Sequence, residues 1–95
     1  KGTVGDPVYA TGDGTINRCD FYGGYGNAVL IDHLGGYQSL YGHLIKVNVI
    51  SGQQVKAGDV IGFLGSTGRS TGPHVHYEIR KDGEDISPEP FLKVF

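Results

Sequence analysis

The sequence lacks several residue types that would mark common classes of protein. It contains no methionine and no tryptophan, only four prolines, and a single cysteine, Cys19, among 95 residues. With one cysteine the chain can form neither an intrachain disulfide nor a cysteine-rich metal cluster. Four prolines are too few for collagen or for a proline-rich linker. Because a primary translation product begins with methionine, the absence of this residue predicts a processed or incomplete chain.

Charge and hydropathy exclude two further classes. The formal net charge of -2 at pH 7 provides no basic surface for nucleic acid or for an anionic membrane. No apolar run approaches the ~18 residues of a membrane span, and none resembles a signal peptide. We therefore expect neither nucleic-acid binding nor membrane insertion.

Glycine, in contrast, is abundant, with 17 residues, and the hydrophobic share of 38% is sufficient for a thin core. Apolar residues alternate at period two, and glycine-rich turns separate the alternating segments. In 27–32 both alternating sets are apolar, which is typical of a strand buried on both faces. Strands are predicted at 7–10, 15–19, 27–32, 37–44, 45–50, 60–64 and 75–80. The sequence thus predicts one all-β domain over residues 1–95, a glycine-rich antiparallel sheet folded over on itself, with no helix longer than a turn.

The segment Gly-Pro-His-Val-His-Tyr-Glu-Ile at 72–79 is the most informative feature. On a strand His74, His76 and Glu78 share one face, and the apolar residues between them share the other. Burial of the apolar face leaves the histidine face either exposed or lining a groove. Such a pair suits a site in which one imidazole binds a metal ion and the other acts beside it; two surface histidines are the alternative. The glycine-rich loop at 65–73 permits close backbone approach and favours a groove.

Two further histidines precede this segment. In the predicted strand 37–44, Leu40 and Leu44 lie on the face opposite His43, so His43 is not on the face best suited to the core. A single histidine of this kind is more often structural, but together with His-x-His it becomes a candidate third imidazole of one site. His33 follows Asp32 at a Gly-Gly turn, and we interpret it as a turn or packing residue.

Three strings resemble the lysostaphin-like zinc metallopeptidases. They are G-Y-G-N-A-V-L-I-D-H, G-G-Y-Q-S-L-Y-G-H-L and V-K-A-G-D-V-I-G-F-L-G-S-T-G-R-S-T-G-P-H-V-H-Y-E-I, in that order. The core S-T-G-x-S-T-G-P-H-x-H-x-E is highly specific. The resemblance implies the fold of that family and a zinc-dependent endopeptidase that acts on peptide cross-links or bridges of bacterial peptidoglycan. Because peptidoglycan lies outside the cytoplasmic membrane, we expect a periplasmic or extracellular location.

The same resemblance implies roles for individual residues. The second histidine of His-x-His, His76, is the zinc ligand of this motif. His74 and His43 flank the catalytic water without binding zinc, where an imidazole can transfer a proton and stabilise an oxyanion. Separately from the resemblance, we suggest that Tyr41 and Asn27 help to shape the groove from behind the residues that line it.

The sequence departs from the family at two zinc ligands, a histidine and an aspartate in an H-x-x-x-D motif upstream of P-V-Y-A-x-x-D-G. No such motif occurs here, and Val4 occupies the aspartate position if the first residues follow that histidine. These 95 residues alone are therefore expected to bind zinc poorly. Either the two ligands lie in residues that the sequence does not include, or the domain is a degenerate, non-catalytic module that binds cell wall or activates another hydrolase. We favour the first explanation, because His43, His74 and His76 all remain.

Overall fold

The computed structural model describes residues 4–65, 76–82 and 84–85. Its strands are β1 Pro7–Tyr9, β2 Gly14–Phe21, β3 Asn27–Asp32, β4 Tyr37–Val47, β5 Gln54–Val55, β6 Val60–Leu64, β7 His76–Lys81 and β8 Glu84–Asp85. Helical structure in this part of the chain consists of two single 3-10 turns, η1 Gly23–Tyr25 and η2 Leu34–Gly36. Within the same ranges, no helix is long and apolar enough to cross a membrane.

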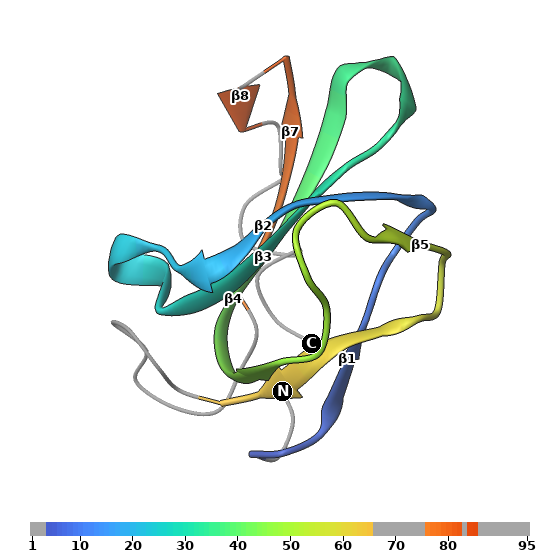
Figure 1. The fold of residues 1–95 in the computed structure, drawn as a ribbon. Coiled ribbons are helices and arrows are strands. Elements are labelled where there is room, and N and C mark those ends of the chain that lie inside the picture. The colour runs from blue at the N-terminus through green and yellow to red at the C-terminus, as the bar shows by residue number, and fades with distance from the viewer. Residues whose placement is uncertain (1–3, 66–75, 83, 86–95) are drawn as a thin grey trace.

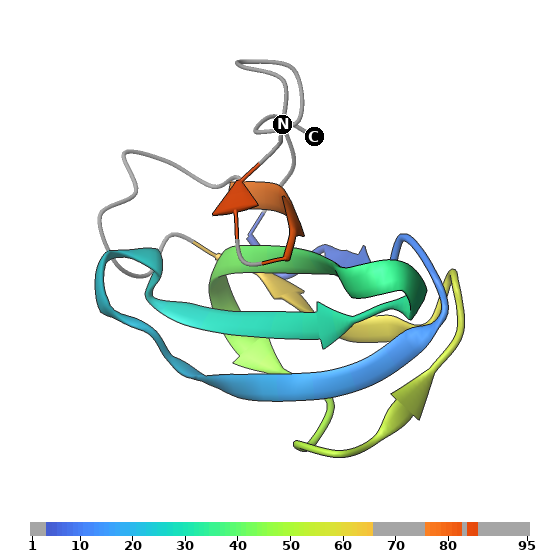
Figure 2. The ribbon, with the colours of Figure 1, turned by 90° about the horizontal axis from the view of Figure 1, so that it is seen from above.

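The sheet is organised around β4, its longest strand. The strand order is β1-β6-β4-β3-β2-β5, with all pairs antiparallel, and β7 also pairs with β4 and then with β8. The first part of β4, Tyr37 to Gly42, pairs with β7, and the part from Leu44 to Val47 pairs with β6. Figure 1 shows β2, β3 and β4 crossing the middle of the curled sheet, and Figure 2 shows the β7–β8 hairpin rising above β4. β4 therefore changes partner along one edge, close to position 43.

The core has two parts, one on each face of β3. Ala28 and Leu30 pack with Leu40 in the smaller cluster, whereas Val29 and Ile31 belong to the larger one. The other buried members of the larger cluster are Ala10, Ile16, Tyr41, Leu44, Val49, Val55, Ile61, Leu64 and Tyr77. Full burial of an aliphatic side chain contributes about 1.5–3 kcal/mol to folding. The prediction that 27–32 is buried on both faces is confirmed.

Two features of the predicted strand pattern are wrong. Residues 45–50 do not form a strand of their own, because β4 continues through to Val47 and residues 48–50 lie outside the strands. Leu44 and Ile45 are consecutive residues of types that do not favour turns, so the sequence contains no turn signal at this point. The predicted pattern also lacks the strands β5 and β8, because two residues are too few to show an alternation.

Gly65, at the end of β6, permits a close approach to β4. Its N–H donates a 3.1 Å hydrogen bond to the carbonyl of His43, and a Cβ at this position would lie only 2.6 Å from the backbone nitrogen of Ile45. Gly65→Ala must therefore separate β6 from β4, and we expect a loss of about 1–3 kcal/mol in the free energy of unfolding, measured by urea denaturation. Gly12→Ala is the control, because its methyl group would lie 3.4 Å from the nearest atom, in the His33 ring, which is an ordinary van der Waals distance. Equal effects of the two variants would contradict the prediction.

Candidate active site

β4 contains one extra residue, at His43. From Asn27 to Val29, β3 advances by two residues, while the paired segment of β4, Leu44 to Tyr41, advances by three. His43 has a φ of 62°, in the left-handed region that costs an L-residue other than glycine about 1–2 kcal/mol. The strand therefore has a β-bulge at His43, a feature that redirects side chains and often lies next to active sites.

The bulge reverses the alternation of side chains along β4. Leu40 lies in the smaller core cluster and Leu44 in the larger one, so the predicted common face for these two leucines is wrong. His43 is only 6% exposed, and its ring lies edge-on to the ring of His76, with 5.8 Å between their centroids. The structure thus brings together two of the three predicted site histidines. His74, like the glycine-rich loop beyond Gly65, lies outside the described residues.

Gly42 makes room for His76 beside Tyr25. His76 is the residue of β7 that pairs with Gly42, and a Cβ on Gly42 would lie 3.4 Å from the Cβ of His76 and 3.3 Å from that of Tyr25. The imidazole of His76 packs against the phenol ring of Tyr25, with 5.1 Å between centroids. Sequence reasoning did not single out Tyr25, because a tyrosine in a glycine-rich turn resembles any surface aromatic residue.

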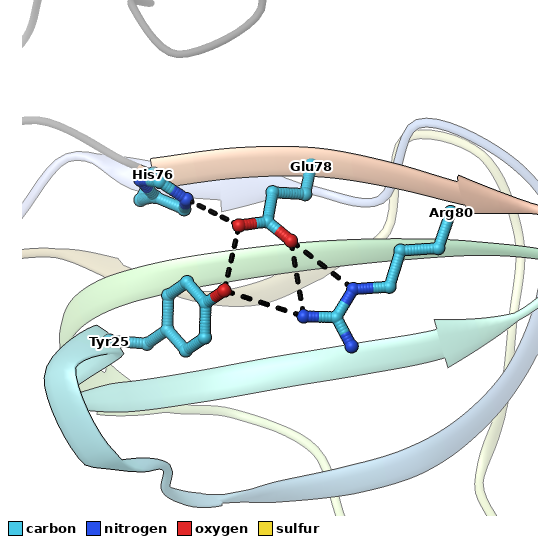
Figure 3. A network of polar contacts seen from close by, with 4 residues as sticks. All are labelled: Tyr25, His76, Glu78 and Arg80. Atoms are coloured by element: carbon cyan, nitrogen blue, oxygen red, sulfur yellow. Dashed lines mark hydrogen bonds and ion pairs between the residues drawn. The ribbon is translucent and has the colours of Figure 1, made fainter. Parts of the chain in front are cut away.

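Glu78 forms the centre of a polar network next to these rings (Figure 3). Its Oε2 accepts hydrogen bonds of 2.8 Å from His76 Nε2 and from the hydroxyl of Tyr25. Its Oε1 accepts bonds from Arg80, at 3.2 Å from Nε and 3.1 Å from Nη2. Burial alone would raise the pKa of Glu78, but the hydrogen bonds from its three partners outweigh burial and hold this pKa below its usual value. The site therefore contains a buried, charged carboxylate.

This network leaves one nitrogen of His76 for a metal ion. Glu78 occupies Nε2, so Nδ1 is the nitrogen that can bind, and a carboxylate on the second ring nitrogen is typical of metal-binding histidines. Among residues 4–65, 76–82 and 84–85, no three His, Cys, Asp or Glu side chains lie close enough to hold a metal ion together. The described residues thus fit one ligand of a metal site and do not complete its coordination.

Two other residues singled out in the sequence, His33 and Tyr41, are linked through the hydroxyl of Ser39. The Nδ1 of His33 is 2.6 Å from the carbonyl oxygen of Asp13, and its Nε2 is 2.7 Å from the hydroxyl of Ser39, which confirms the interpretation of His33 as a turn or packing residue. Tyr41 is 1% exposed, and its hydroxyl hydrogen-bonds with those of Ser39 and Thr11. The ring of Tyr41 belongs to the larger core cluster, and its suggested contribution to the shape of the groove stays a prediction.

Similarity to known proteins extends over nearly the whole chain. The model of peptidase family M23 matches residues 1–88. The DD-carboxypeptidase/endopeptidase Mpg of Neisseria meningitidis is 52% identical over 84 residues, which are 88% of this chain and 19% of that protein. The peptidoglycan DD-endopeptidase ShyC of Vibrio cholerae is 44% identical over 85 residues, 90% of this chain and 20% of that protein. The chain therefore spans about a fifth of the length of these curated relatives.

Solved structures of other proteins share this fold. The catalytic domain of lysostaphin from Staphylococcus simulans superposes with a TM-score of 0.85 at 37% identity and covers 96% of this chain and 73% of that one. A zinc-containing peptidase from Vibrio cholerae gives a TM-score of 0.85 at 40% identity and covers 90% of this chain and 26% of that one. The predicted all-β architecture is confirmed.

Proposed function

The chain belongs to peptidase family M23, as its resemblance to the lysostaphin-like enzymes indicated, and on this premise we propose that it is the hydrolytic domain of a zinc-dependent endopeptidase. Its substrates are peptide cross-links of bacterial peptidoglycan, of the D,D type that the names of the Neisseria and Vibrio relatives specify. Such a substrate places the reaction in the cell envelope, either in the periplasm or outside the cell. The observation that carries the proposal is the edge-on pair of imidazoles of His43 and His76, beside a buried carboxylate.

In this proposal His76 holds zinc through Nδ1. The zinc content of the Vibrio cholerae structural relative supports the choice of metal. The family resemblance implies two further ligands, a histidine and an aspartate of an H-x-x-x-D motif, and this motif does not occur in the 95 residues. When bound, zinc adds Lewis-acid chemistry to the site, which polarises a scissile carbonyl and acidifies water.

His43 is the proposed proton-transfer group. Its imidazole is buried next to that of His76, within reach of a reacting group bound there, and a positioned imidazole can move a proton or stabilise an oxyanion. The strained φ at this position supports a functional role, because strain of this kind persists mainly where it positions a functional group. The same role for His74 remains a prediction from the resemblance.

A row of rings leads away from these histidines and suits an extended peptide. Tyr25 packs on His76, Tyr22 packs on Tyr25 with 5.3 Å between centroids, and the guanidinium of Arg18 lies 4.1 Å above the ring of Tyr22. Aromatic faces provide broad contact area for peptide planes and aliphatic side chains. We propose that the substrate peptide lies along this row. A contribution from Asn27, at the start of β3, remains a prediction.

Cross-linked peptidoglycan fragments test the function directly. A protein that carries this chain with the two upstream ligands is incubated with a D,D-linked muropeptide dimer or with a dimer joined by a glycine bridge. We expect monomers from the first substrate only, detected by mass spectrometry. A chelator abolishes cleavage, and added zinc restores it. Binding of either dimer by the zinc-loaded protein without cleavage would contradict the proposal and favour the non-catalytic module.

A further inference from the structure

The hydrogen bond between Glu78 and His76 bears on the position of the ring proton of His76. We propose that Glu78 is a positioning residue that fixes the tautomer of His76, with the ring proton on Nε2 and the lone pair of Nδ1 directed to the metal side. This inference rests on the proposed function for its purpose, since it concerns the ring that holds zinc. The tautomer itself is a property of the metal-free chain and can be measured without catalysis.

The hydrogen bond between His76 and Glu78 has only one workable direction. An ionised carboxylate accepts hydrogen bonds and donates none, so the 2.8 Å contact with Oε2 requires a proton on Nε2. The opposite tautomer of the neutral ring would place two acceptors against each other. The Glu78 side chain is 7% exposed and that of His76 is 20% exposed, so little water is available to relieve such a contact, and burial of an unsatisfied polar group is costly.

Arg80 and Tyr25 keep the carboxylate in this orientation. Arg80 binds Oε1 through two nitrogens, and its side chain is 17% exposed. The hydroxyl of Tyr25 donates a hydrogen bond to Oε2 of Glu78, the oxygen that also accepts from His76. The ring of Tyr25 packs against the imidazole of His76. Because a guanidinium can only donate hydrogen bonds, whatever atom faces Arg80 has to be an acceptor. This condition determines what an isosteric replacement of Glu78 can do.

Glutamine at position 78 is expected to invert the tautomer of His76. Its amide has one acceptor, which has to face Arg80, so the NH₂ group faces Nε2 of His76 and the oxygen of Tyr25. Nε2 then accepts a hydrogen bond, and the proton of the neutral ring moves to Nδ1. In Glu78→Gln the nitrogen assigned to the metal therefore carries a proton, although the shape of the side chain hardly changes.

The tautomer can be read from the ¹⁵N NMR shifts of the imidazole nitrogens in the metal-free 95-residue chain, where these shifts report a neutral ring. We expect a proton on Nε2 in the unchanged chain and on Nδ1 in Glu78→Gln. Tyr25→Phe is the matched control, because it removes one hydrogen bond to Oε2 but keeps the carboxylate and the aromatic ring, so it should retain the original tautomer. A proton on Nδ1 in the unchanged chain overturns the proposal, even if Glu78→Gln fails to fold, and so does an unchanged tautomer in Glu78→Gln.

Zinc affinity is the second readout. In a protein that carries the chain with both upstream ligands, Glu78→Gln should weaken zinc binding by about 10–100-fold, the usual effect of losing the partner of a metal-binding histidine. Titration with zinc alone measures this, and equal affinity would overturn the proposal. Absence of peptidase activity leaves both readouts unaffected, so a failure of the proposed function can be distinguished from a failure of this inference.

Discussion

His76→Ala removes the metal from the site. In a protein that carries this chain with the two upstream ligands, we expect the unchanged form to retain about one zinc ion after exhaustive dialysis, because a catalytic site holds one ion with three protein ligands. The variant should retain essentially none, since two ligands remain and the carboxylate of Glu78 has lost the imidazole that it orients. Peptide hydrolysis should be lost together with the metal. Elemental analysis gives the zinc content, and circular dichroism shows whether the sheet persists.

A second histidine of the same chain provides the control for this experiment. Both ring nitrogens of His33 are engaged by Asp13 and Ser39, away from His76. His33→Ala should therefore retain its zinc, although it loses stability through the two broken hydrogen bonds. If the His76 variant still held one zinc ion per chain, the assignment of this ligand would be wrong.

The fold was largely predictable because glycine-rich turns separate most of its strands. In 27–32 two interleaved apolar sets indicated burial on both faces, and β3 is buried in this way. Glycine-rich turns marked most strand ends, since glycine is the residue that tight turns require. The same reasoning divided β4 in two, because a long strand that changes partner at position 43 has no signature in the sequence.

The site was predictable only in part, for physical reasons that differ from residue to residue. His76 was found through its spacing in His-x-His, which a strand converts into a shared face. The position of His43 depends on a bulge, and histidine at this position gives no sign of a positive φ. Tyr25 reaches Glu78 across 53 positions of sequence, through the pairing of β4 with both β3 and β7. Contacts of this kind arise from sheet topology, and local patterns do not encode them.

His43→Gly separates the chemistry of the imidazole from the strain of its backbone. Glycine adopts a φ of 62° without steric cost, so this variant should keep the bulge, the fold and the bound zinc. It lacks the proposed proton-transfer group, and we expect turnover of a D,D-linked muropeptide to fall by about 10²–10⁴-fold, the usual contribution of general acid–base catalysis. The measurement is kcat in a protein that carries the two upstream ligands, together with its zinc content.

Alanine at the same position is the matched comparison. His43→Ala loses the same imidazole but retains the unfavourable backbone conformation, so its free energy of unfolding should be lower than that of His43→Gly by about 1–2 kcal/mol. Turnover should be equally low in both variants, because neither has a group that moves a proton. Turnover near the unchanged level in His43→Gly would exclude the proposed role. Loss of zinc from both variants would instead make His43 a metal ligand, contrary to the role that the family resemblance implies.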